Sequence, residues 1–185
     1  ILGGHEHENW AIARGPRLTP IVKADANVRS VAVVTLDFGR PGSRPVVSSR
    51  LQSVDASVPM QPDVQAVVTR WVDTAFEAFK ADGLSPRAVV VNTPVPLDGR
   101  ESVIRTGSGL LTDIITASFL RECKEATIGI LNGGSIRIDD VLPAGPVREY
   151  DLIRILPFGG KVAQATLDGD LLVRVLDAGV ANRGS

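Results

Sequence analysis

A chain of 185 residues with 44% hydrophobic and 22% charged residues has the composition of a globular protein that can bury a sizeable core. Its formal net charge of −1 lacks the basic excess of proteins that bind nucleic acid polymers, and its apolar runs fall short of the roughly 18 residues of a membrane span. With Cys123 as its one cysteine, the chain forms no intrachain disulfide.

The stretch ILGGHEHENW, residues 1–10, opens the chain without an initiator Met or a basic leader, so we expect the interior of a longer protein. His5 and His7, the only histidines, lie two residues apart after two glycines. Neutral imidazole is a common ligand of zinc and similar ions. A metal site needs three or four protein ligands, so a solvated polar loop remains the alternative.

The next segment is rich in β-branched residues and turns. Strands are expected at 19–24 and 30–36, and a third near 46–51 after a loop rich in Gly and Pro. We expect residues 1–58 to be a β-rich part with an exposed sheet edge.

A helix is predicted over residues 62–82, because apolar residues recur at i, i+3 and i+4. Pro62 suits its first turn and Gly83 its C-terminal cap. Trp71, Phe76 and Phe79 share the apolar spacing and are predicted to lie in the core. Residues 59–84 are interpreted as a linker helix between two domains.

Residues 85–185 form the second predicted domain, in which short apolar runs alternate with one helical pattern and one capped helix. The expected elements are strands at 88–92, 102–105, 127–131 and 161–167, a helix at 110–120 capped by Ser108, and a helix that begins after Asp168.

The segment from Asn132 to Gly160 groups the residues best suited to a ligand. It follows the predicted strand 127–131, and α/β folds place ligands at the C-terminal ends of strands. Gly133 and Gly134 permit positive φ and close approach of a bound group. Arg137 offers a fork of donors, and the glycines after Phe158 leave one face of its ring uncovered. This set suits a purine with a phosphate or ribose; the alternative is a tight turn with Phe158 in the core.

Two adjacent acids, Asp139 and Asp140, lie on the turn that leads to Pro143. A single pair of loop carboxylates lacks the converging partners of a metal site. We expect both side chains to be solvated.

Three motifs together resemble one family. Asn132-Gly-Gly-Ser-Ile-Arg137 and Asp151-Leu-Ile-Arg-Ile-Leu-Pro-Phe158 resemble the C-terminal domain of the 5′-nucleotidase family, and Gly-Gly-His5-x-His7 resembles the last metal-ligand motif of the calcineurin-like metallophosphoesterase domain that precedes it. The resemblance implies a mixed α/β fold. Residues 1–58 would be a β-rich remnant of the metallophosphoesterase domain, and 85–185 a truncated C-terminal, substrate-binding domain.

The resemblance also assigns roles to residues. Asn132 and Arg137 would contact the nucleotide, Phe158 would stack on its base next to Gly160, and Arg105 would reach the nucleotide from another segment. In place of the family's Glu three residues after this Arg, and of its Gly-Asn before the helix, the chain has Ser108, Thr112 and Asp113. Ser135 replaces the third Gly of the Asn132 motif. The loss of the Glu leaves open how Arg105 is held, with an exposed arginine on a strand edge as the alternative.

By the same resemblance His5 and His7 would each bind one of two divalent ions, such as zinc or manganese. The family's other ligands, its catalytic His, a second aromatic and a ribose-binding Asp all belong to segments outside this sequence. We therefore expect no catalytic residue in this chain and no activity of the chain alone.

The implied parent is a metal-dependent hydrolase of nucleotide phosphate esters, active in nucleotide catabolism. Two alternatives stay open: a non-catalytic nucleotide-binding or interaction module, and a phosphoesterase for a non-nucleotide or cyclic-nucleotide ester. The expected partners are a nucleotide or related phosphate ester and the rest of the catalytic domain. The family resemblance implies an extracytoplasmic location.

Overall fold

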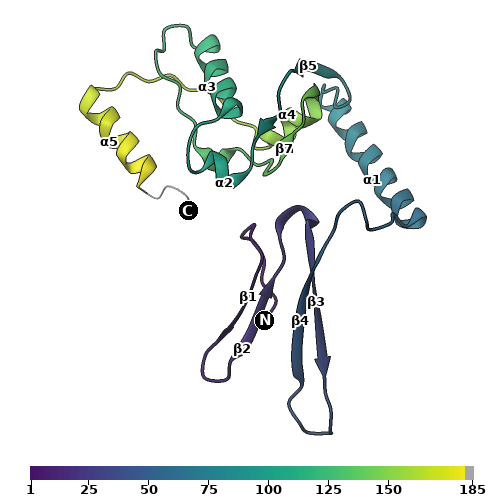
Figure 1. The fold of residues 1–185 in the computed structure, drawn as a ribbon. Helices are drawn as coiled ribbons and strands as arrows, with labels where there is room; N and C mark the ends of the chain where they lie inside the picture. The colour runs from purple at the N-terminus through teal and green to yellow at the C-terminus, as the bar shows by residue number, and fades with distance from the viewer. Residues whose placement is uncertain (182–185) are drawn as a thin grey trace. The chain divides into compact units, whose positions relative to one another are not determined.

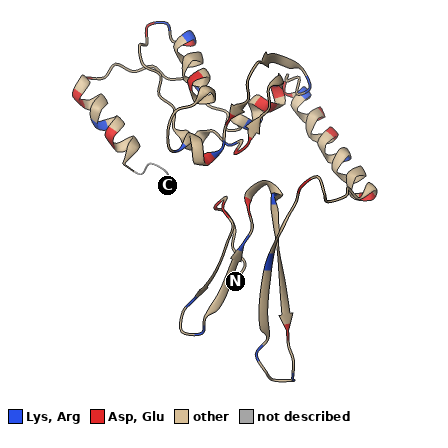
Figure 2. Ribbon diagram, viewed as in Figure 1, with Lys and Arg blue, Asp and Glu red and all other residues tan. Residues whose placement is uncertain are grey.

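The computed structural model describes residues 1–181 and divides the chain into two compact units, Ile1–Thr69 and a second unit from Arg70 onward. The chain contains both helices and strands, which is the mixed α/β class expected from the sequence (Figure 1). Acidic and basic positions are interspersed along the elements of each unit (Figure 2).

The first unit consists of two antiparallel hairpins. Strand β1 (Trp10–Arg14) pairs with β2 (Thr19–Lys23), and the longer β3 (Ser30–Asp37) pairs with β4 (Val46–Ser53). A short 3-10 turn, η1 (Ala26–Val28), joins the hairpins. The predicted strands 19–24, 30–36 and 46–51 are confirmed within two residues, whereas β1 was not predicted.

Helix α1 (Pro62–Ala81) confirms the helix predicted over residues 62–82. Gly83 has φ of +86°, and its amide donates to the Lys80 carbonyl at 3.0 Å, so it ends the helix as predicted. Phe76 and Phe79 both pack on Tyr150. Their ring centroids lie 5.0 Å and 6.4 Å, respectively, from the centroid of the Tyr150 ring. Trp71 is 63% exposed, so the prediction that it lies in the core is wrong for the isolated chain.

The second unit is built on two short antiparallel pairings between segments far apart in sequence. Strand β5 (Val89–Thr93) pairs with β8 (Gly145–Arg148), and β6 (Leu97–Asp98) pairs with β7 (Val141–Leu142). The unit also contains the helices α2 (Glu101–Ile104), α3 (Leu110–Glu122), α4 (Glu149–Ile155) and α5 (Gly169–Val180).

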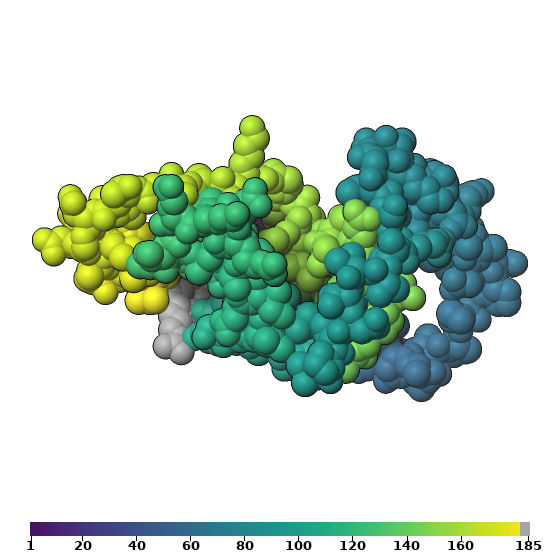
Figure 3. All heavy atoms as spheres, turned by 90° about the horizontal axis from the view of Figure 1, so that it is seen from above, coloured from purple at the N-terminus to yellow at the C-terminus, as the bar shows by residue number. Residues whose placement is uncertain are grey.

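An apolar cluster holds these elements together. Its buried members come from strands β6, β7 and β8, from helices α2, α3 and α4, and from the segment after Asn132: Leu97, Ile104, Leu111, Ile115, Ile136, Ile138, Leu142, Val147 and Ile155. The space-filling view shows the teal and green atoms of these segments packed against one another (Figure 3). Ile136 and Ile138, 1% and 4% exposed, carry the segment after Asn132 into this core.

Three predicted strands are absent from the described part of the chain. Residues 102–105 belong to α2 and its end, where the Ile104 and Arg105 amides donate to carbonyls four residues earlier at 3.0 Å each. Segments 127–131 and 161–167 form no strand, because no other described segment pairs with their backbones. Ile128 and Ile130 are accordingly 54% and 49% exposed.

The helix caps also differ from prediction. Gly109, not Ser108, is the N-cap of α3, and its amide donates to the Thr112 hydroxyl at 2.8 Å. Asp168 occupies the N-cap position of α5 but makes no side-chain capping bond.

Candidate functional site

The turn at Asn132 is held by its own side chain. The Asn132 side-chain oxygen accepts a hydrogen bond from the Gly134 amide at 3.1 Å, and residues Gly133–Ser135 form the 3-10 turn η2. Neither Gly133 nor Gly134 adopts positive φ, so that expectation is wrong. Packing instead favours glycine at position 133, because a Cβ there would lie in a tight contact, 3.2 Å from the Ile104 carbonyl oxygen.

Arg137 is aimed outward by its neighbours. Ile136 and Ile138 on either side are buried, and in an extended segment alternate side chains point to opposite faces. The Arg137 amide donates to the Ile155 carbonyl at 2.9 Å, which ties the segment to α4. Its side chain remains 35% exposed.

Phe158 lies just beyond α4 with its ring 66% exposed, so it is not a core residue. The Arg137 guanidinium carbon is 5.9 Å from the ring centroid, within the range of a cation–π contact. Gly159 and Gly160 are exposed and place no side chain on the ring. The structure thus brings Arg137 and Phe158 together with one aromatic surface open to a ligand.

Arg105 is held by a residue that sequence reasoning missed. Its Nη2 lies 2.7 Å from Glu101 Oε1, four residues earlier on α2, and the same oxygen lies 3.8 Å from Arg137 Nη1. Arg105 is therefore held by an ion pair with Glu101, although the family's usual Glu is absent. The i, i+4 spacing of the pair is a helical signal, but it was hidden because residues 102–105 were predicted as a strand.

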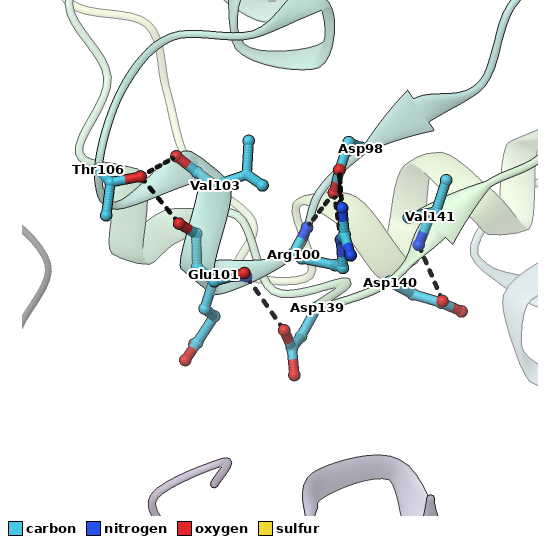
Figure 4. A network of polar contacts seen from close by, with 9 residues as sticks. Asp98, Arg100, Glu101, Val103, Thr106, Asp139, Asp140 and Val141 are labelled. Atoms are coloured by element: carbon cyan, nitrogen blue, oxygen red, sulfur yellow. Dashed lines mark hydrogen bonds and ion pairs between the residues drawn. The ribbon is translucent and has the colours of Figure 1, made fainter.

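The prediction that both aspartates of the turn are solvated is wrong for Asp139, which is 5% exposed. Asp139 accepts a hydrogen bond from the Glu101 amide at 3.0 Å and so fixes the first turn of α2 (Figure 4). Asp140 is exposed, as predicted, and lies 3.5 Å from Arg154.

An open hollow of about 600 Å³ adjoins Arg105 and Asn132. It is lined by three segments of the second unit: residues 104–108, 132–134 and 178–180. The lining includes four glycines, 107, 133, 134 and 179, which leave room for a group to approach the main chain. Arg137 and Phe158 lie outside this lining and connect to it through Glu101 and Arg105.

The histidine loop, residues 5–9, lies in the first unit. His5 is exposed with φ of +81°, whereas His7 is partly buried and its carbonyl accepts from the Ala26 amide at 3.2 Å. The buried Lys23 amine donates to the Glu6 carbonyl at 3.0 Å and contacts the Glu6 carboxylate at 3.2 Å. Hydrogen bonds from backbone and from Lys23 lower the pKa of Glu6.

A second polar contact closes the histidine loop. The Asp25 carboxylate accepts from the Ser30 hydroxyl and from the Asn9 amide and side chain, the last at 2.7 Å. These bonds, the one from Ser30 first, lower the pKa of Asp25.

The two imidazoles suit a divalent ion, but they do not complete a site here. Within residues 1–181 no group of three or more His, Cys, Asp or Glu side chains converges. The chain's own donors therefore account for part of a metal site at most.

The arrangement in the second unit offers an exposed aromatic face and two guanidinium groups linked through Glu101, and the Asn132 amide lines the hollow beside Arg105. Such a set can stack on a planar base and donate to anionic oxygens.

Comparison with known proteins gives a family and a fold. The model of the "5'-nucleotidase, C-terminal domain" family matches residues 89–185. The trifunctional nucleotide phosphoesterase protein YfkN of Bacillus subtilis is 24% identical over 190 residues, which cover 98% of this chain and 12% of that protein. The 5'-nucleotidases of Homo sapiens and Bos taurus are each 27% identical over 180 residues, covering 91% of this chain and 30% of theirs.

Among solved structures, the 5'-nucleotidase precursor from Thermus thermophilus matches the whole chain with a TM-score of 0.69 at 20% identity. The match covers 38% of that chain. It confirms the expected C-terminal-domain fold, while the present chain spans less than a third of the curated relatives that it matches.

Proposed function

Because the chain belongs to the family of 5′-nucleotidase C-terminal domains, we propose that it supplies the nucleotide-binding residues of a metal-dependent phosphohydrolase. The parent protein hydrolyses nucleotide phosphate esters, and this chain alone is inactive. The observation that carries the proposal is the exposed Phe158 ring with Arg137 at 5.9 Å, linked through Glu101 to Arg105.

Each group has a role that its chemistry suits. Phe158 stacks on the base, since a ring that is 66% exposed offers a flat apolar surface without rearrangement of the core. Gly160 keeps the approach to this ring free of side chains. Arg105 and Arg137 bind anionic or hydroxyl oxygens through charge-assisted hydrogen bonds. Asn132 caps the η2 turn beside the hollow and orients the ligand there.

Binding far from the reacting bond contributes to hydrolysis by alignment. Contacts to the base and ribose lower the barrier when they hold the phosphoryl group in its reactive position. The specificity of the parent enzyme then follows from which base stacks on Phe158, while the phosphate end is common to all nucleotides.

His5 and His7 would each hold one divalent ion in the parent, with the remaining ligands supplied by other segments of the protein. Such ions would supply the activation of a water and the neutralisation of charge on the phosphoryl oxygens. What this chain contributes is the placement of the imidazoles: Lys23 and Asp25 hold the histidine loop at both ends. Zinc and manganese are the ions for which this site would be tested first.

None of the described helices is long and apolar enough to cross a bilayer. We place the parent outside the cytoplasm, as the family resemblance implies.

Isothermal titration of the chain with AMP, adenosine and inorganic phosphate tests the proposal. AMP is expected to bind more tightly than phosphate, and Phe158→Ala or Arg137→Ala to weaken AMP binding by about tenfold, equivalent to about 1.4 kcal/mol. Matched controls are Phe38→Ala, at a ring that is 63% exposed in the first unit, and Arg121→Ala on the exposed end of α3.

The controls are expected to bind AMP like the wild type. If both site variants also bind AMP like the wild type, the proposed nucleotide site is wrong. If wild type prefers phosphate to AMP, the proposal that a base is recognised here is wrong.

A further inference from the structure

Glu101 joins two arginines that come from different parts of the second unit. Its Oε1 lies 2.7 Å from Arg105 Nη2 and 3.8 Å from Arg137 Nη1. Arg105 ends α2, whereas Arg137 belongs to the segment after η2. One carboxylate oxygen therefore contacts both guanidinium groups and fixes their positions relative to each other.

The carboxylate is itself firmly placed. Its side chain is 19% exposed, and its backbone amide donates to the buried Asp139 at 3.0 Å. The segment that carries Asp139 also carries Ile136 and Ile138 into the core. Figure 4 shows Glu101 at the start of α2 with Asp139 directly beside its amide. The position of Glu101 is therefore fixed by its contact with a segment of the buried core.

Its charge has a consequence for anion binding. The Glu101 carboxylate offsets one of the two positive charges that Arg105 and Arg137 bring together. The attraction of a site for small anions rises with its net positive charge. A carboxylate in this position therefore reduces binding of simple phosphate while it keeps both arginines in a defined geometry.

We infer that Glu101 is a positioning and specificity-determining residue, which aligns Arg105 with Arg137 and lowers the affinity of the site for plain anions. Tight binding then depends on a second group of the ligand that stacks on Phe158. This last step rests on the proposed function, whereas the effect on the arginines and on phosphate does not.

The test compares Glu101→Gln with Glu122→Gln in the full chain. Each variant removes one negative charge, but Glu122 lies at the exposed end of α3. Glutamine preserves the size of the side chain, and matching circular dichroism spectra establish that the fold is kept. Glu101→Asp serves as the conservative variant, since it restores the charge.

The first readout is titration with inorganic phosphate. Glu101→Gln is expected to bind phosphate at least threefold more tightly than wild type, whereas Glu122→Gln and Glu101→Asp stay within twofold of it. The second readout is the nuclear magnetic resonance spectrum of the arginine guanidinium groups without ligand. In wild type the N–H signals of Arg105 and Arg137 are expected to be resolved, and in Glu101→Gln to broaden or average.

Equal phosphate affinity in the two glutamine variants overturns the inference, and so do unchanged guanidinium signals in Glu101→Gln. The outcome for the proposed function is separate. If wild type shows no preference for AMP over phosphate, nucleotide recognition is refuted, while a rise in phosphate affinity in Glu101→Gln still supports the role of Glu101.

Discussion

Substitution of Ile136 by alanine tests the coupling between the core and the candidate site. Ile136 is 1% exposed within the buried cluster and directly precedes Arg137. The change deletes three carbons, at about 0.8 kcal/mol each for transfer to water, and leaves a cavity that adds to the cost. We expect the free energy of unfolding of the second unit to fall by about 3 kcal/mol.

Urea unfolding followed by far-ultraviolet circular dichroism is the assay, because helices α2 to α5 all lie in the second unit. Ile130→Ala is the matched control: it makes the same chemical change at a residue that is 49% exposed, and about 1 kcal/mol or less is expected. Equal losses at the two positions would contradict the buried placement of Ile136 and with it the outward aim of Arg137.

Three further predictions concern other contacts. Lys23→Met removes the amine that contacts Glu6, so amides of the histidine loop are expected to exchange with deuterium faster; unchanged exchange would show that Lys23 does not hold the loop. The pKa of Asp25 is lowered from 3.8 by Ser30 and Asn9, so the stability that it contributes is present above about pH 4 and is lost as the pH falls through the lowered value. Asp25→Asn is expected to remove this acid-dependent loosening, seen as a flatter pH profile of loop exchange; an identical profile would refute the assignment. Gly99→Ala places a Cβ 2.4 Å from Ile138 Cγ2 and is expected to cost about 1–3 kcal/mol in urea unfolding, whereas Gly107→Ala, with no atom within 4 Å, should cost less than about 1 kcal/mol.

The local signals in the sequence were sufficient for elements whose stabilising contacts lie close in the chain. Helix α1 follows from its apolar spacing, from Pro62 in its first turn and from Gly83, which caps it within a few residues. The hairpin of β3 and β4 follows from two β-branched runs around a turn. The family motifs likewise named Asn132, Arg137 and Phe158, and the structure groups the last two at 5.9 Å.

Elements that depend on distant partners were missed or misassigned. Strands β6 and β7 have two residues each and exist because Leu97 pairs with Leu142, some 45 positions later in the chain. The apolar run 127–131 has the composition of a strand, but a strand requires a neighbouring backbone to accept its hydrogen bonds, and none lies beside it in the described chain.

The sequence by itself determined the family and the mixed α/β class, and it predicted Asn132, Arg137 and Phe158 as binding residues, because motif identity and hydrophobic periodicity are local properties of the chain. Only the tertiary structure decided how those residues are held. The roles of Glu101 and Asp139 arise where two segments some 38 positions apart meet over the core, so that a backbone amide and two guanidinium groups converge on two carboxylates. Such convergence depends on the packing of distant segments, which no short stretch of sequence encodes.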